Sequence, residues 1–207
     1  CPKELAQKYD SDGIDEIYVQ DTTASLYGTE INYDLIHDIA NLITVPLIVG
    51  GGIKSIHDCY NLLAVGADRV AINSALTSDL GLAERIRNIF GSQFLLGCIE
   101  YRLNEKNKPL LFYNYGRELL QSNILDQSKK LIDSGVGELV LRCITNDGTF
   151  KGLNWQILDY LGDDITVPII LLGGANSNDF LVKDKRVSGI AMGSCLHYGR
   201  LNLGHIE

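Results

Sequence analysis

Acidic and small polar residues stand directly after the apolar runs of this chain, where acid–base chemistry and ligand binding could take place. Glu100 is the clearest case, because it closes the buried run Phe94–Ile99. A carboxylate in that position is partly withdrawn from water, which suits a general acid or base. The structural alternative is an ion pair with Arg102 or with another arginine at the same end of the strands. Both interpretations stay open here.

Two glycine-rich segments could bind anions. The run Ile43–Ile53 contains Gly50-Gly51-Gly52, and it returns almost intact 122 residues later as Ile165–Ala175, which contains Gly173-Gly174. A glycine backbone can approach a ligand closely, and its free N–H groups can hold a phosphate. Two copies suggest two phosphate sites; the alternative is a pair of turns that only connect strand to helix.

The same offset relates other parts of the two halves. Several agreeing segments at one spacing favour an internal duplication over chance similarity. The further matched positions are Gly13 with Gly135, Glu16 with Glu138, and Ile17-Tyr18-Val19 with Leu139-Val140-Leu141.

Apolar, β-branched runs without polar alternation predict strands that are buried on both faces, as in a parallel sheet covered by helices. The expected strands begin near Glu16, Pro46, Arg69, Phe94, Glu138, Val167 and Gly189. The expected helices are Glu4–Tyr9, Tyr33–Leu42, Ser55–Val65, Gly81–Phe90, Asn123–Asp133, Asn154–Tyr160 and Asp179–Val182. The segment Tyr101–Glu118 interrupts this alternation, and we expect a hairpin-like insertion there, with a disordered excursion as the alternative.

The duplication constrains the fold class. Three expected strands of the first half match three of the second, which leaves the strand near Phe94 without a counterpart; that counterpart would fall before Cys1. We therefore expect residues 1–207 to form a single α/β domain, a (β/α)8 TIM barrel built from two half-barrels, with strand 1 missing from this chain. An open doubly wound sheet is the alternative, and it would place the ligand loops differently.

In a (β/α)8 barrel the ligand site lies at the carboxyl ends of the strands. Taken singly, Asn73 and Ser194 could cap helices, and Asp147-Gly148 could be a turn. The groups that the barrel would gather at that end are Asp21, Gly52, Asn73, Glu100, Asp147, Gly174 and Ser194. The charged residues expected at the opposite, amino-terminal end, as a salt-bridged plug or as a gate, are Glu16, Arg69 and Glu138.

Composition narrows the classes of partner. A formal net charge of −8 and a pI near 5.0, with no basic stripe, argue against nucleic acid and membrane surfaces, although a small anionic ligand stays open. Five cysteines without CxxC spacing indicate reduced thiols in a cytoplasmic protein, and they suggest neither a metal site nor a cofactor. No apolar run reaches 18 residues and no charged-then-apolar segment precedes Cys1, so we expect neither a membrane span nor a secretory signal.

Several segments together resemble the cyclase subunit of imidazole glycerol phosphate synthase, a histidine-pathway family of (β/α)8 barrels that arose by half-barrel duplication. The resemblance covers nearly the whole chain. It is carried by Asp21–Ser25, Val49–Ile53, Gly66–Ala75, Phe90–Gln93, Asp147–Thr149, Gly173–Ala175 and Ser194–Tyr198.

The resemblance implies a synthase that takes ammonia from a glutaminase subunit docked at the amino-terminal face of the barrel. Ammonia passes through the barrel to a bisphosphorylated ribulosyl aminoimidazole carboxamide, and the products are imidazole glycerol phosphate and an aminoimidazole carboxamide ribotide. By the same resemblance, one phosphate is held by Gly52, Asn73 and Ser74, and the other by Asp147, Gly148, Gly174, Gly193 and Ser194. The implied gate residues are Glu16, Arg69 and Glu138, and the implied docking residue is Asp68.

The chain departs from the family pattern at its active face. Of the two catalytic aspartates of the family, the first would lie on the missing strand, and Glu100 stands in place of the second. A glutamate side chain is about one methylene longer than an aspartate side chain, and a misplacement of a catalytic group by about 1 Å can lower the rate a hundredfold. Arg142 replaces a threonine, Leu172 a serine and Tyr115 another serine. These changes motivate two alternatives: an ammonia-dependent paralogue that acts on a surface-polysaccharide sugar, and a barrel that binds or regulates without catalysis.

Overall fold

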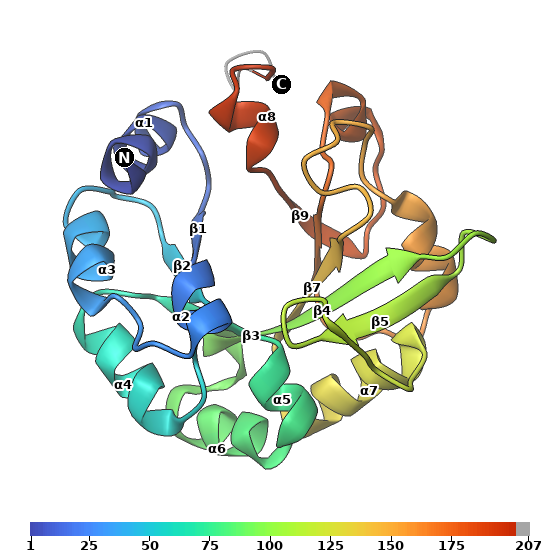
Figure 1. Ribbon diagram of the computed structural model, residues 1–207, viewed down its shortest axis with the longest axis horizontal. Coiled ribbons are helices and arrows are strands. Elements are labelled where there is room, and N and C mark those ends of the chain that lie inside the picture. Colours follow the sequence, from blue (N-terminus) through green and yellow to red (C-terminus); the bar gives the residue numbers. More distant parts are fainter. Residues whose placement is uncertain (202–207) are drawn as a thin grey trace.

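The computed structural model describes residues 1–201, in which seven parallel strands curl into an incomplete ring (Figure 1). The parallel strands neighbour one another in chain order, whereas a doubly wound sheet reverses its order at a switch point, so that alternative is wrong. The predicted barrel-type fold is confirmed, with β1 and β9 as the edges of the ring among the described residues. In order, the seven strands are β1 (Ile17–Gln20), β2 (Leu47–Gly50), β3 (Arg69–Ile72), β4 (Leu95–Leu103), β7 (Glu138–Cys143), β8 (Ile169–Leu172) and β9 (Val187–Ala191).

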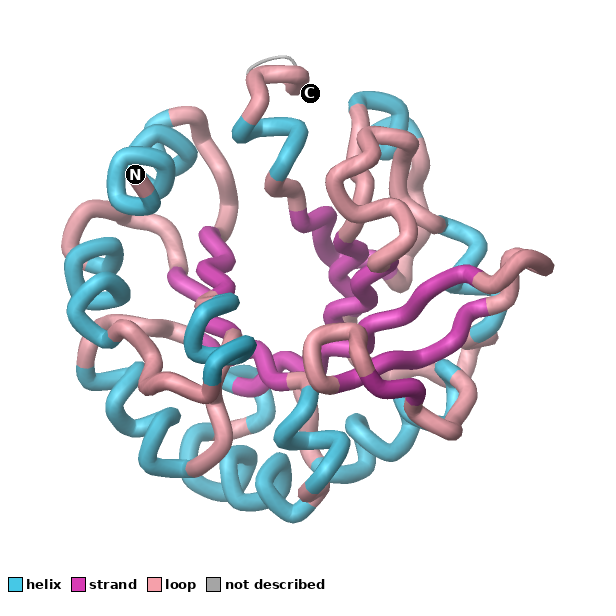
Figure 2. Tube along the Cα trace, viewed as in Figure 1, coloured by secondary structure: helices cyan, strands magenta, loops and turns pink. Residues whose placement is uncertain are grey.

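Helices cover the outside of the ring, and strands line its inside (Figure 2). The longer helices follow the sequence prediction closely: α1 (Pro2–Ser11), α3 (Tyr33–Ala40), α4 (Ile56–Ala64), α6 (Gly81–Phe90) and α7 (Ile124–Ser134). Helix α4 begins as predicted at Ser55, whose hydroxyl accepts the Asp58 N–H while the Asp58 carboxylate accepts the Ser55 N–H. Within residues 1–201, no helix is both long and apolar enough to cross a membrane.

Short elements were harder to predict. The expected helices near residues 154–160 and 179–182 are the 3₁₀ helices η2 (Trp155–Tyr160) and η3 (Ser177–Leu181), and a third, η1 (Ser92–Phe94), precedes β4. Short pieces of 3₁₀ helix are common as connectors between longer elements. Three further short helices stand at strand ends, where sequence analysis had placed only polar loops: α2 (Thr22–Tyr27), α5 (Ser74–Ser78) and α8 (Ser194–His197).

The predicted insertion is an antiparallel hairpin, which β4 forms with β5 (Pro109–Tyr113) and β6 (Glu118–Leu119). The prediction that the strand ends at Glu100 was too short, because β4 continues to Leu103. Tyr101 and Leu111 pair across β4 and β5, and both side chains are fully buried. Burial of these two side chains stabilises the extension of β4 beyond the ring.

The ring has two separate apolar cores. The larger lies between sheet and helices, and the smaller fills the inside of the ring with Ile48, Ala71, Leu96 and Val140. Alternate residues of a strand point to opposite faces, so Val19 of β1 packs toward the helices while Tyr18 packs against the inner core. The side chains that partly cover the inner core are Tyr18, Cys98, Ile170 and Leu172.

The structure confirms the duplication at the level of atoms. The register Ile17↔Leu47 of β1 with β2 recurs 122 residues later as Leu139↔Ile169 of β7 with β8. In the first half, a side chain at Gly51 would overlap the carbonyl oxygen of Asp21. In the second half, a Cβ at Gly173 would lie 2.5 Å from the carbonyl oxygen of Cys143, which is the position 122 residues after Asp21. We call Gly51-Gly52 the first glycine rim and Gly173-Gly174 the second.

Gly173→Ala should lower the free energy of unfolding by about 3 kcal/mol, since its φ of +112° disfavours a side chain and the new methyl group would meet the Cys143 carbonyl. The matched control is Gly162→Ala, at φ +63° with no atom within 4 Å of the added carbon, which should cost about 1 kcal/mol. Urea denaturation of both variants measures the difference. Equal losses would mean that the close approach at the second glycine rim is not a constraint on folding.

Candidate active site

One large cavity lies over the inner core of the incomplete ring, and residues from the amino-terminal end to the carboxyl-terminal mouth line it, including those of the edge strands β1 and β9. Residues of both glycine rims line it, Gly52 in the first and Gly174 in the second, together with Glu100 between them. The two glycine segments therefore face a common mouth, as the barrel prediction required. The predicted residues that line this mouth are Gly52, Asn73, Ser74, Glu100, Asp147, Gly148, Gly174, Gly193 and Ser194.

Glu100 lies at the centre of this mouth, and its carboxylate is held from two sides. Asn73 Nδ2 donates to Glu100 Oε2 at 3.1 Å, and Arg142 Nη1 donates to Glu100 Oε1 at 3.0 Å. Asn73 occupies the N-cap position of α5 but makes no side-chain cap bond, so the capping alternative is wrong for this residue. Arg102 donates to the Gly116 carbonyl instead, so the expected arginine partner of Glu100 is Arg142.

Arg142 joins two carboxylates. Besides Glu100 it contacts Asp147 Oδ2, at 2.6 Å from Nη2 and 3.1 Å from Nε. Burial opposes the charge of the guanidinium, but Asp147 and Glu100 outweigh it and raise the pKa of Arg142. Arg142 therefore places a permanent positive charge between Glu100 and Asp147 at the mouth.

Asp21 turns away from the mouth. Its Oδ1 accepts the N–H groups of Thr23 and Ala24 at 3.0 and 2.9 Å, and its Oδ2 accepts the Asn32 N–H at 3.2 Å. Partial burial works against ionisation, yet these donors hold the pKa of Asp21 below its usual value. The carboxylate caps α2, and its neighbours Gln20 and Thr22 line the cavity. Gln20 was not predicted as a site residue, because the run Glu16–Gln20 carries no signal other than that of a strand.

In each half, a short helix starts at the same cavity that the glycine rims line. On the first side, Ser74 begins α5, and its Oγ accepts the Asn114 N–H from the hairpin tip at 3.0 Å. On the second side, Gly193 is the N-cap residue of α8, and Ser194 begins that helix without making a cap bond. The hairpin contact was not foreseen, because it joins residues 40 positions apart.

The charged residues of the amino-terminal end form one cluster, as predicted. Arg69 lies 2.5 Å from Glu138 (Nη2 to Oε2) and 3.5 Å from Glu16 (Nη1 to Oε1). Its Nε donates to the Gln93 carbonyl at 2.9 Å, and Ser188, which sequence analysis missed, donates to Glu138 at 2.6 Å. This cluster lines the same cavity as Glu100, at the other end.

Asp68 lies beside this cluster at the amino-terminal face. Its side chain is exposed, and Oδ2 accepts the Leu47 N–H at 2.8 Å, which ties the start of β3 to the start of β2. One carboxylate oxygen is therefore used within the protein, and the residue stays at the surface.

The fold and the cavity define a (β/α) barrel protein with its candidate ligand site at the carboxyl ends of the strands. A profile of the histidine biosynthesis protein family matches residues 1–202, and the chain belongs to that family. A Bacillus cereus relative named imidazole glycerol phosphate synthase subunit HisF is 32% identical over 209 residues, which cover 100% of this chain and 83% of the relative. A Dictyoglomus turgidum relative of the same name is 33% identical over 207 residues, which cover 99% and 82%.

Arg69→Met should destabilise the fold by roughly 3–5 kcal/mol, because it leaves the buried Glu138 carboxylate without its charge partner. Urea denaturation of the Arg69→Met/Glu138→Met double variant should recover much of that loss. Glu16→Gln is the matched control: its contact is 3.5 Å long and its side chain 36% exposed, so we expect a loss under about 1 kcal/mol. If the double variant is as unstable as the single one, the cluster is not coupled through Arg69.

Proposed function

We propose that this protein is the cyclase-type subunit of an imidazole glycerol phosphate synthase. It would use ammonia from a glutaminase subunit to convert a bisphosphorylated ribulosyl aminoimidazole carboxamide to imidazole glycerol phosphate and aminoimidazole carboxamide ribotide. The observation that carries the proposal is Glu100, a half-buried carboxylate that stands between two duplicated glycine rims at one mouth. Membership of the family and the names of the relatives point the same way.

In this proposal the two rims hold the two phosphates of the substrate. On one side Gly52 and Ser74 supply backbone and hydroxyl groups, and Asn73 fixes Glu100. On the other side the donors come from Gly148, Gly174, Gly193 and Ser194, next to Asp147. A glycine backbone and a helix start are both suited to phosphate oxygens.

Glu100 would transfer protons at the middle of the substrate. Its two oxygens already accept hydrogen bonds from Asn73 and Arg142, which fix the position of the carboxylate. The contact between Glu100 and Arg142 joins two neighbouring strands, because these residues are register partners in β4 and β7. Rigid strands therefore position the proposed catalytic group.

The cavity supplies the proposed path for ammonia. It joins the Arg69 cluster at one end to Glu100 at the other, past Ala71 and Val140 of the inner core. The glutaminase would dock at the amino-terminal face, where Asp68 is exposed. We also propose a cytoplasmic location, in keeping with five free cysteines and with this biosynthetic role.

A second candidate is an ammonia-dependent synthase for a different substrate, such as a surface-polysaccharide sugar. It is favoured by the Glu100–Arg142–Asp147 ion pairs, which put charge at the point where a substrate would react. Supplying the protein with ammonium and the ribulosyl substrate separates the candidates. Turnover supports the cyclase, tight binding without turnover favours a non-catalytic barrel, and the absence of both favours the other substrate.

Glu100→Gln should reduce ammonium-dependent turnover at least a hundredfold while substrate affinity changes less than about fivefold, because the amide keeps the shape but cannot accept a proton. The measurement is kcat with ammonium, next to calorimetric titration with the ribulosyl substrate. Glu105→Gln, an exposed residue of the hairpin, is the control and should behave as wild type. Undiminished kcat in Glu100→Gln would remove Glu100 from the mechanism.

Asp68→Ala should lower glutamine-dependent turnover roughly tenfold at limiting glutaminase, because a charge of the docking face is lost. Turnover with added ammonium should stay within twofold of wild type, and this second assay is the internal control for folding. A parallel fall in both rates would show that Asp68 acts on the barrel through its Leu47 contact rather than on docking.

A further inference from the structure

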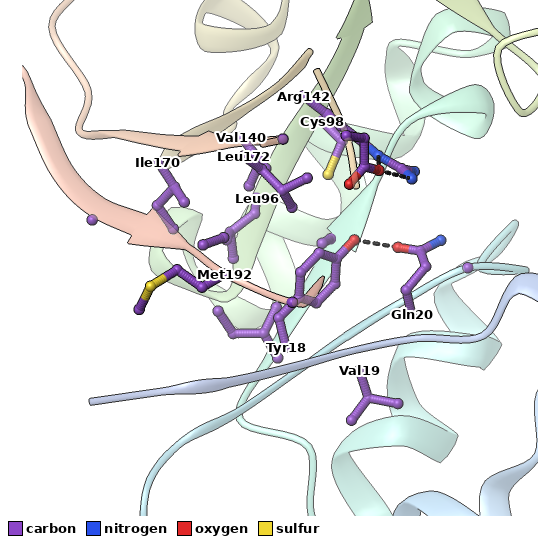
Figure 3. A pocket seen from close by; sticks show the side chains of 18 of the residues that line it. Tyr18, Val19, Gln20, Leu96, Cys98, Val140, Arg142, Ile170, Leu172 and Met192 are labelled. Carbon is purple, nitrogen blue, oxygen red and sulfur yellow. Dashed lines mark hydrogen bonds and ion pairs between the residues drawn. The ribbon is translucent and has the colours of Figure 1, made fainter. Parts of the chain in front are cut away.

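A polar pair stands inside the first half of the ring, next to the proposed substrate site. Tyr18 and Gln20 lie two residues apart on the inner face of β1, and both line the cavity. The Tyr18 hydroxyl donates to Gln20 Oε1 (Figure 3). The carboxamide oxygen of Gln20 faces Tyr18, and the Nε2 amino group of Gln20 therefore points away from the tyrosine (Figure 3). That amino group has no hydrogen-bond partner among the described residues.

Gly50 makes room for this pair. A Cβ at Gly50 would lie 2.6 Å from the Tyr18 hydroxyl oxygen and 2.8 Å from Gln20 Oε1, so any side chain there would displace this pair. Gly50 is also the register partner of Gln20 in β2. The glycine therefore has a role apart from the rim that follows it: it allows the tyrosine to fix the orientation of the carboxamide.

The second half carries a different set at the same positions. The residue 122 positions after Gln20 is Arg142, and its register partner is Leu172 where the first half has Gly50. The two halves thus place N–H donors at equivalent points of the mouth, a neutral carboxamide in one and a charged guanidinium in the other. Arg142 already contacts Glu100 and Asp147, whereas Gln20 Nε2 is free to bind a ligand.

We infer that Gln20 is a specificity-determining residue: its Nε2 group donates a hydrogen bond to an oxygen in the uncharged middle of an elongated bisphosphate whose ends are held by the two glycine rims. This inference rests on the proposed function, and it extends it by assigning the contact to the middle of the substrate. Tyr18 and Gly50 are positioning residues, since they hold the carboxamide in the orientation that offers its donor. A middle bearing hydroxyl or carbonyl oxygens fits this donor, and an apolar middle does not.

Calorimetric titration of the whole protein without ammonium tests the inference, with the ribulosyl substrate, fructose bisphosphate and inorganic phosphate as probes. Gln20→Leu should weaken binding of the bisphosphates roughly tenfold, since one hydrogen bond to the ligand is lost. Affinity for inorganic phosphate, which needs one rim only, should stay within twofold. Tyr18→Phe and Gly50→Ala should each cause a smaller loss, about threefold, because the carboxamide stays but its orientation is no longer fixed.

Val19→Ala is the matched control in the same strand, because Val19 borders the cavity but its side chain packs against the helix-side core, on the face of β1 opposite to Tyr18 and Gln20. It should lower stability and leave all affinities unchanged. Gln20→Glu keeps an acceptor for Tyr18 and removes the donor, so it should weaken bisphosphate binding at least as much as Gln20→Leu.

Two results would overturn the inference: wild-type affinity of Gln20→Leu for both bisphosphates, or an equal loss for inorganic phosphate and the bisphosphates. Failure of the proposed function looks different. In that case wild-type protein would bind fructose bisphosphate but not the ribulosyl substrate, and the Gln20 effect would still be measured on the sugar. Binding of neither bisphosphate by wild-type protein is a third result that would overturn the inference.

Discussion

The rest of this structure depends on the close packing of two glycines against backbone carbonyl groups, where no side chain fits. Gly51 and Gly173 each press against a carbonyl group at the end of the preceding parallel strand, Asp21 in one half and Cys143 in the other. Any side chain there would force neighbouring strand ends apart. The same close contact occurs in both halves, and both glycine rims therefore line one mouth although they lie far apart in the chain. The candidate site is a consequence of that packing.

Two arginine-centred clusters divide the cavity between them. Arg69 pairs with acidic groups at the amino-terminal end, and Arg142 pairs with Glu100 and Asp147 at the mouth. Between the clusters lies the inner core of Ile48, Ala71, Leu96 and Val140, with Tyr18 and Cys98 packed against it. Burial raises the pKa of the Cys98 thiol to about 12, so this side chain stays neutral there. Each arginine finds its acidic partners on the strands or directly next to them.

The two halves of the site have the same backbone arrangement, but they carry different side chains at equivalent positions. The pair Tyr18 and Gln20 over Gly50 corresponds to Val140 and Arg142 beside Leu172. Gln20 is paired with Gly50 in the first half, whereas Arg142 is paired with Leu172 in the second, so the polar groups differ at equivalent positions of the mouth. Two similar glycine rims with different polar side chains between them suit a ligand that has two similar ends and an asymmetric middle.

Much of the fold could be predicted from the sequence, because strand burial, helix period and the repeat at 122 residues are local or periodic signals. They sufficed for the barrel class, the longer helices and the gathering of Glu100, Asn73 and the glycines at one end. Short elements escaped, since α2 and α5 span too few residues to show a period.

The sequence by itself therefore determined the order of the elements and which of their ends face the ligand. Only the tertiary structure decided what each polar side chain does there. Asp21 caps a helix, Asn73 holds Glu100 instead of capping one, and Gln20 turns its amide past Tyr18. These choices depend on partners from other strands, and a carboxylate or amide in a sequence carries no sign of which donor will reach it first.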